Sequence, residues 1–73
     1  MKTKLLASAP TLYDLGEQVN QFFYGQGGYY VRDNGDNTFE IRHFSRPLPP
    51  GFHERYTVRK TRERYQFRIA TTQ

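Results

Sequence analysis

The sequence contains no cysteine and only two histidines. The lack of cysteine excludes disulfide frameworks and thiolate metal sites, and it gives no sign of an extracellular scaffold. His43 and His53 lie in no paired-carboxylate context, so they do not indicate a transition-metal site. We therefore expect no cofactor and no metal, and we take the cytoplasm as the expected location.

Long hydrophobic runs are also missing. The first apolar patch, residues 5–9, is shorter than a signal-peptide core and far shorter than the roughly 20 residues of a membrane span. We interpret residues 1–10 as a short strand or a flexible arm. No association with a membrane is expected.

The usual enzyme motifs are absent as well. No nucleophile stands beside a base, no carboxylates are paired, and GQGG at residues 25–28 follows a helical pattern rather than the strand that precedes a nucleotide-binding loop. Residues 33–37 resemble part of a calcium loop but lack its spacing and its closing glutamate. We assign no catalytic and no metal-binding residue, and we expect a protein that is not an enzyme.

What is present suits one small domain, residues 1–73. A chain of this size buries only about 60% of its unfolded surface, which argues against a large enzyme pocket. Aromatic residues make up 16% of the chain, so we expect a compact core built from a few large side chains.

A helix is predicted in TLYDLGEQVNQFFYGQGG, with Thr11 as the N-cap, Asp14 three residues later and Gly25 as the stop. Its apolar stripe is formed by Leu12, Leu15, Val19, Phe22 and Phe23. Gly16 interrupts the helix at a cost of about 1 kcal/mol relative to alanine, which suggests that another element packs closely there.

A β-hairpin is predicted next, with strands at residues 29–32 and 38–44. A two-residue turn at Asn34 and Gly35 sets Tyr30 opposite Phe39, whereas a bulged type I turn sets Tyr29 opposite Phe39. We favour the second register because it places one apolar set on one face of the hairpin. That set is Tyr29, Val31, Phe39 and Ile41.

Residues 45–52, SRPLPPGF, form a rigid connector, because three prolines in four positions fit neither a ladder nor a helix. After it, residues 56–69 alternate as strands do. One strand of this length would measure about 46 Å at about 3.3 Å per residue, too long for a domain of about 11 Å radius of gyration. A turn near residues 60–63 is expected, and a hairpin and one bent strand both stay open.

The predicted fold class is α+β, with one N-terminal helix packed on one face of a three- to four-stranded, mostly antiparallel sheet. The other face is then open to solvent. Alternation places on that open face Tyr30, Arg32, Glu40, Arg42, Phe44, Arg55, Thr57, Arg59, Arg64, Gln66 and Arg68.

Charge is unevenly distributed along the chain. Residues 1–40 carry three basic and five acidic side chains, and residues 41–73 carry eight basic and two acidic ones, which gives the net charge of +4. Seven of those eight basic residues are arginine, which forms planar, bidentate contacts with phosphate, carboxylate or guanine. The positive field therefore comes from the C-terminal half.

These features predict a small non-enzymatic accessory or regulatory protein that binds DNA or RNA through the open face. The candidate contacts are Arg32, Arg42, Arg55, Arg59, Arg64, Arg68, Tyr30 and Phe44. The alternative is a protein-interaction or inhibitor module that binds an acidic partner. Five aromatics within residues 22–30 also suit self-association as a homodimer.

A third interpretation is metal-independent RNA cleavage, in which Tyr, Arg and His side chains supply acid, base and charge stabilisation. The order of helix, glycine pair, strand and hairpin resembles the toxin ribonucleases of the HicA family and double-stranded-RNA-binding domains. The histidine that HicA proteins carry at the start of the second strand is not found at residues 36–38, and no closing helix follows. No residue is carried over from this resemblance.

Overall fold

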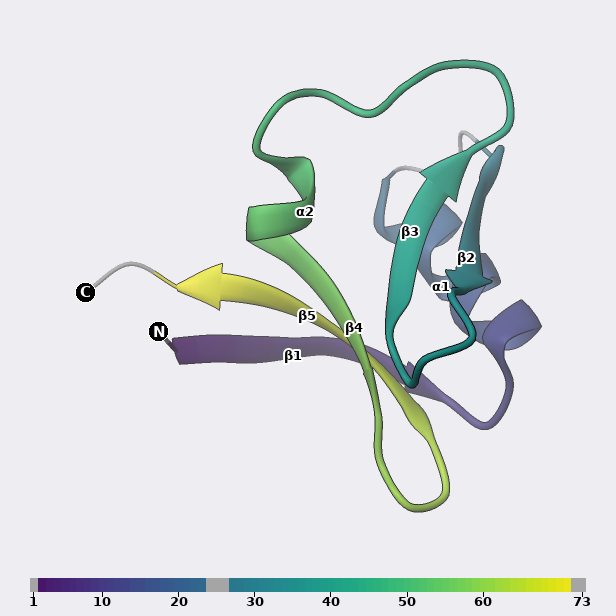
Figure 1. Ribbon diagram of the computed structural model, residues 1–73, viewed down its shortest axis with the longest axis vertical. Helices are drawn as coiled ribbons and strands as arrows, with labels where there is room; N and C mark the ends of the chain where they lie inside the picture. The colour runs from purple at the N-terminus through teal and green to yellow at the C-terminus, as the bar shows by residue number, and fades with distance from the viewer. Residues whose placement is uncertain (1, 24–26, 72–73) are drawn as a thin grey trace.

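The computed structural model describes residues 2–23 and 27–71 of the chain. In this part of the chain the fold is α+β, as predicted, with a helix packed against an antiparallel sheet (Figure 1). The sheet has five strands in the order β1-β5-β4-β3-β2, more than the three or four expected. The elements are β1 (Lys2–Ala9), α1 (Leu12–Phe22), β2 (Tyr29–Asp33), β3 (Phe39–His43), α2 (Phe52–Arg55), β4 (Tyr56–Lys60) and β5 (Tyr65–Thr71).

Strand β1 accounts for part of the difference in strand number. The segment expected as a short strand or an arm pairs with β5 over nearly its whole length, from Lys2 opposite Thr71 to Ala9 opposite Tyr65. One irregularity between Leu5 and Ala7 shifts the register. The first and last strands of the chain therefore lie side by side at one edge of the sheet (Figure 1).

The C-terminal segment resolves into a hairpin rather than one bent strand. Strand β4 ends at Lys60 and β5 begins at Tyr65, and the turn is closed by the Thr61 N–H donating to the Arg64 carbonyl at 2.8 Å. The expected turn is thus confirmed, although it contains no Gly, Pro, Asn or Asp. The Thr61 hydroxyl, which donates to the same carbonyl and accepts from the Arg64 N–H, supplies the turn chemistry instead.

The sheet is strongly twisted, and its two halves meet at a single point. Strands β3 and β4 are paired only at Phe39 opposite Val58. In Figure 1 the β2–β3 hairpin consequently stands at a steep angle to β1 and β5. The gap that opens between the diverging strands is the main irregularity of the fold.

The predicted hairpin register is wrong by four residues. Asp33, not Tyr29, lies opposite Phe39, and Tyr29 lies opposite His43. The loop is longer than expected because Asn34 and Thr38 close it with a backbone hydrogen bond of 3.0 Å, and Asn37 adopts a left-handed conformation at φ 69°. A shift by an even number leaves every side chain on its predicted face.

Helix α1 begins as predicted, with the Thr11 hydroxyl accepting from the Asp14 N–H at 3.1 Å. It buries Leu15, Gly16 and Val19 against the sheet. The predicted stop at Gly25 lies outside the described residues. In residues 2–23 and 27–71, no helix is long and apolar enough to cross a membrane.

The core is small and lies between α1 and the sheet. Its buried hydrophobic residues are Ala9, Leu15, Val19, Ile41, Phe52, Val58 and Phe67. Phe67 is fully buried at the centre, with Tyr56 stacked on it at 5.8 Å between ring centroids and Phe22 edge-on at 5.3 Å. Aromatic rings thus provide much of the packing, as the composition predicted.

Helix α2 was not predicted. The chain after the prolines forms one helical turn that starts at Gly51, which has a left-handed φ of 82°, and buries Phe52 in the core. The turn takes Arg55 out of the strand pattern in which the sequence placed it. Strand β4 begins only at Tyr56.

Candidate functional site

The face of the sheet opposite the core carries most of the predicted binding residues. Alternation about the buried positions Ile41, Val58 and Phe67 sets this face, which we call the open face. It brings together Tyr30, Arg32, Glu40, Arg42, Phe44, Thr57, Arg59, Arg64, Gln66 and Arg68. Arg64 precedes β5 but keeps its alternation, and its guanidinium reaches Ser8 of β1.

Arg55 is the exception among the predicted contacts. It ends helix α2 and lines a depression together with Phe23, Phe52 and Tyr56, which belong to the core side of the molecule. The prediction that Arg55 lies on the open face is therefore wrong. The helical turn, which lies between the prolines and β4, breaks the two-residue alternation on which the prediction depended.

The arginines of the open face are held mainly by neutral acceptors. Arg64 donates to the Ser8 hydroxyl at 3.0 Å, and Arg68 donates to the Thr3 hydroxyl at 2.7 Å. Within the described ranges the only ion pairs are Arg42–Glu40 at 3.3 Å and His53–Glu40 at 3.8 Å. Most of the positive charge on this face is thus not neutralised by a carboxylate.

The two predicted aromatic contacts form a pair. The rings of Tyr30 and Phe44 stack with centroids 5.0 Å apart and planes 25° apart, and Phe44 is 79% exposed. Tyr30 stands directly opposite Arg42 in the β2–β3 ladder. An exposed ring surface therefore lies beside a guanidinium group, an arrangement that suits stacking of a planar anion-bearing ligand.

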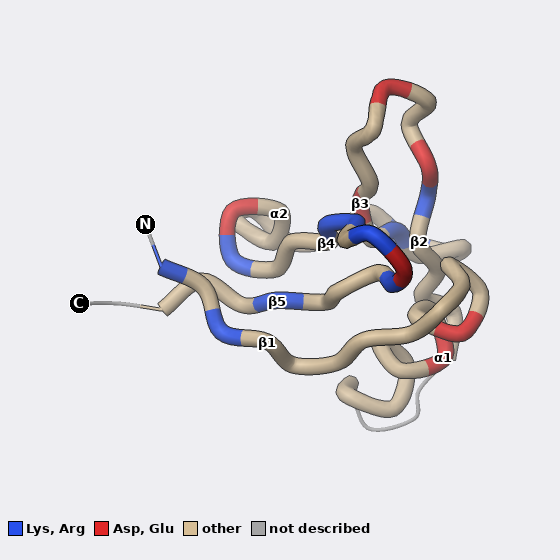
Figure 2. Tube along the Cα trace, turned by 90° about the horizontal axis from the view of Figure 1, so that it is seen from below, with Lys and Arg blue, Asp and Glu red and all other residues tan. Residues whose placement is uncertain are grey.

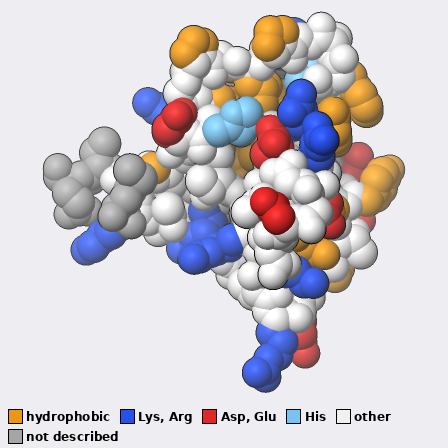
Figure 3. All heavy atoms as spheres, viewed as in Figure 1, with side chains coloured by type: hydrophobic (Ala, Val, Ile, Leu, Met, Phe, Trp, Pro, Cys, Tyr) orange, Lys and Arg blue, Asp and Glu red, His pale blue; other side chains and the backbone are white. Residues whose placement is uncertain are grey.

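Basic and acidic residues lie on different elements of the fold. Figure 2 shows basic positions along β1, β4 and β5, and acidic positions on α1 and at the far end of the β2–β3 hairpin. In Figure 3 the Lys and Arg side chains occur in several separate groups on the viewed face, and a histidine lies beside an acidic side chain. On the viewed face the basic side chains therefore form several groups rather than one patch.

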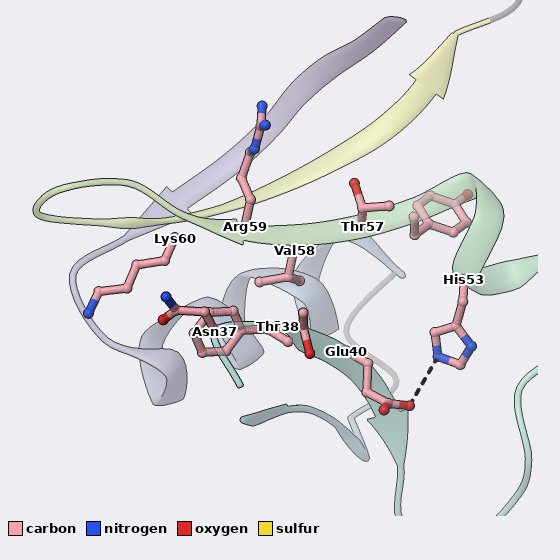
Figure 4. A pocket seen from close by; sticks show the side chains of 10 residues that line it. Asn37, Thr38, Glu40, His53, Thr57, Val58, Arg59 and Lys60 are labelled. Carbon is pink, nitrogen blue, oxygen red and sulfur yellow. Dashed lines mark ion pairs between the residues drawn. The ribbon is translucent and has the colours of Figure 1, made fainter. Parts of the chain in front are cut away.

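A cleft of about 530 Å³ lies where β3 and β4 diverge (Figure 4). The residues that line it are Asn37, Thr38, Phe39, Glu40, His53, Tyr56, Thr57, Val58, Arg59 and Lys60. Figure 4 shows Glu40 and His53 pointing toward each other at one end of the cleft and Lys60 at the other. We call this the β3–β4 cleft.

His53 is held in the β3–β4 cleft by a backbone group that the strands leave free. Its Nε2 lies 2.9 Å from the carbonyl oxygen of Ile41, which faces β4 beyond the last paired position. The sequence alone assigned no role to His53. Alternation had placed Glu40 and Arg42 on one face, but no sequence signal marks the divergence of β3 and β4 that brings His53 to them.

A second groove runs along the outer edge of β2. It has a volume of about 470 Å³ and is lined by Leu12, Tyr13, Gly16, Glu17, Asn20, Gly27, Gly28, Tyr29, Tyr30, Val31 and Phe44. The Asn20 amide pairs with both backbone groups of Tyr29, at 2.9 and 3.3 Å, much as a neighbouring strand would. We call this the α1–β2 groove.

Residues 33–37, which resemble part of a calcium loop, lie at the end of β2 and in the hairpin loop that follows it. No group of three or more His, Cys, Asp or Glu side chains in the described part of the chain is arranged to hold a metal ion. Comparison with known proteins gives no match: no family model, no curated protein and no solved structure is significantly similar to this chain.

Proposed function

We propose that this protein binds single-stranded nucleic acid through the open face, as an accessory or regulatory factor in the cytoplasm. The observation that carries the proposal is the charge of that face. Arg32, Arg42, Arg59, Arg64 and Arg68 stand there against one carboxylate, Glu40. A surface with this excess of guanidinium groups attracts a polyanion, and bidentate arginine contacts suit phosphate.

The aromatic pair favours a single strand over a duplex. The faces of stacked bases are not accessible in a double helix, whereas an unpaired base can stack on an exposed ring. Phe44 and Tyr30 present such a ring surface on the open face, among its arginine side chains. We therefore propose that the rings hold a base and that the arginines hold the phosphates on either side.

The first test is a fluorescence-anisotropy titration of a labelled single-stranded oligonucleotide at several salt concentrations. Four to five arginines that each neutralise a phosphate should give a slope of log K against log salt of about −3, at roughly −0.7 per contact. RNA, DNA and a matched duplex are compared in parallel. Lack of binding by every single strand at about 50 mM salt would rule the proposal out.

Variants separate the two kinds of contact. Arg59→Gln should reduce the salt slope by about 0.7, and Arg55→Gln, which changes an arginine off the open face, should leave it unchanged. Phe44→Ala should weaken binding by about 1–3 kcal/mol with the slope preserved. Tyr13→Ala is its matched control, because Tyr13 is also exposed but lies on α1. Equal effects of Arg59→Gln and Arg55→Gln would contradict the assignment of the binding face.

A second candidate function is protein binding, including self-association, at the α1–β2 groove. The observation that favours it is the exposure of two aromatic side chains at the groove, with Tyr13 77% and Phe44 79% exposed. Sedimentation velocity at increasing concentration tests the homodimer. Tyr13→Lys should keep the chain monomeric if the groove mediates it, and nucleic-acid binding by the open face should persist.

A further inference from the structure

We propose that the β3–β4 cleft cleaves RNA without a metal ion, with Glu40 as general base and His53 as general acid. This inference rests on the proposed function, because the open face must deliver the strand to the cleft. It adds an activity that binding alone does not require.

Among the described residues of the open face Glu40 is the only carboxylate, and it lines the β3–β4 cleft. Its Oε2 atom is 3.3 Å from Arg42 Nη1 and 3.8 Å from His53 Nε2. The Glu40 side chain is 30% exposed, so a hydroxyl group of a bound ligand can reach the carboxylate. A carboxylate held between a guanidinium group and an imidazole ring has a fixed position, which a general base requires.

The hydrogen bond of His53 indicates which ring nitrogen carries a proton. A carbonyl oxygen only accepts, so Nε2, at 2.9 Å from the Ile41 oxygen, carries a proton. Nδ1 forms no hydrogen bond to another group among the described residues. When the ring carries a second proton, Nδ1–H is free to donate, because Nε2–H is already held by the Ile41 carbonyl.

The cleft also attracts and accommodates a phosphodiester. Arg59 and Lys60 line it together with the hydroxyl of Thr57, and no carboxylate other than Glu40 belongs to its described lining. Its volume of about 530 Å³ falls within the usual range for small-ligand sites, about 300–1,000 Å³, so a nucleotide fits. Figure 4 shows Arg59 pointing away from Glu40 and His53, so a phosphate next to Glu40 would lie at the His53 end of the cleft.

RNA supplies its own nucleophile, which makes the reaction possible without a metal. The 2′-oxygen of a ribose attacks the adjacent phosphorus while Glu40 accepts the 2′-hydroxyl proton. The bond from phosphorus to the 5′-oxygen of the next nucleotide breaks, and that oxygen receives the Nδ1 proton of His53. The products are a 2′,3′-cyclic phosphate and a 5′-hydroxyl end. Glu40 is left protonated and His53 neutral, and water returns the proton from one to the other.

The test uses the whole chain with a single-stranded DNA oligonucleotide that contains one ribonucleotide, in a buffer with excess chelator. Cleavage should occur only on the 3′ side of the ribonucleotide, and mass spectrometry should identify a cyclic phosphate end. The all-deoxy strand should stay intact while it binds with similar affinity. Binding is measured on the same samples by anisotropy, so binding and cleavage are judged separately.

Three variants, each purified in the same way, assign the roles. Glu40→Gln and His53→Gln should each reduce the cleavage rate by about 10²–10⁴-fold, the usual contribution of general acid–base catalysis. Glutamine at position 53 keeps an N–H for the Ile41 carbonyl, so the position of α2 is retained. His43→Gln, at the other histidine of the chain, which does not line the β3–β4 cleft, should cleave at the wild-type rate.

Glu40→Gln gives the sharpest contrast, because binding and cleavage should respond differently. Removal of the carboxylate from a phosphate-binding surface should leave affinity equal or higher while cleavage is lost.

Intact RNA in the presence of demonstrated binding would overturn the cleavage proposal and leave the proposed function standing. Loss of both binding and cleavage in the wild type would refute both proposals. Equal cleavage by the wild type and His53→Gln would overturn the role of His53, with thermal melting used to confirm that each variant is folded.

Discussion

At the residue scale, the hairpin loop shows how local hydrogen bonds determine a turn. The Asp33 carboxylate accepts from the Gly35 N–H at 2.8 Å, and the Asp36 carboxylate accepts from both the N–H and the hydroxyl of Thr38. Such contacts between a side chain and the backbone two residues on are the reason that Asp favours turns. They stabilise a five-residue loop that the two-residue turn rules do not describe.

The Thr38 hydroxyl, together with the backbone N–H of Thr38, also lowers the pKa of Asp36 below its ordinary value of 3.8. The folded chain then binds this proton more weakly than the unfolded chain, so the contribution to stability is complete above pH 3.8 and is lost as the pH falls through the folded pKa. Thr38→Val should return the pKa of Asp36 toward 3.8, measured by NMR titration of the carboxyl carbon. An unchanged titration would show that the hydroxyl is not the cause.

At the scale of elements, Gly16 of α1 gives a direct test of helix packing. The helix passes close to the backbone of β2, as the sequence suggested, but a Cβ on Gly16 would lie 3.6 Å from the Tyr30 Cα, an ordinary contact. Alanine is about 1 kcal/mol better than glycine inside a helix. Gly16→Ala should therefore raise the free energy of unfolding by about 0.5–1 kcal/mol in urea titrations.

Gly28, just before β2, is the matched control for that substitution. Its φ is 90°, and a Cβ there would lie 2.5 Å from the His43 ring. Gly28→Ala should lower the free energy of unfolding by about 1–3 kcal/mol, because the backbone conformation and the ring contact both oppose a side chain. Opposite signs for the two Gly→Ala changes would establish that α1 packs on β2 as described.

The sequence predicts which side chains share a face of the sheet, but it does not predict which strands pair or in which register. A two-residue period identifies which side chains point together, and it did so for Tyr30, Arg32 and Arg42. Register depends on the loop, whose length was underestimated by the usual turn rules. The number of strands depended on β1, which pairs with β5 from the opposite end of the chain.

The candidate site was likewise predictable only in part from the sequence. Alternation predicted the arginines and the ring pair of the open face, since these lie on regular strands. Helix α2 interrupts the alternation, which moved Arg55 away and brought His53 to Glu40. Proximity of His53 to Glu40 follows from the divergence of β3 and β4, a long-range packing result that no local pattern encodes.

At the scale of the whole molecule, both edge strands of the sheet carry features that oppose pairing with a further strand. The β1 edge carries Lys2, Lys4 and an irregularity after Leu5. The β2 edge is occupied at Tyr29 by the Asn20 amide. Lysines, bulges and covering groups are the usual means of preventing edge-to-edge association. Extension of the sheet between copies is therefore disfavoured.

The small core makes the stability of the whole molecule depend on one ring. A domain of 73 residues has a free energy of unfolding of about 4–11 kcal/mol. Phe67 is fully buried and contacts the rings of Phe22 and Tyr56, so Phe67→Ala should cost about 3–5 kcal/mol. We expect this variant to lose at least about a quarter of its stability in urea unfolding followed by circular dichroism.

A Phe→Ala substitution at an exposed position tests whether burial is the cause of the stability loss expected for Phe67→Ala. Phe44 is 79% exposed and stacks only on Tyr30 among the described residues, so Phe44→Ala should change the free energy of unfolding by about 1 kcal/mol or less. Phe67→Leu, which keeps most of the buried volume, should fall between the two. If Phe44→Ala destabilised the chain as much as Phe67→Ala, the open face would be part of the core, and the proposed nucleic-acid surface would lose its basis.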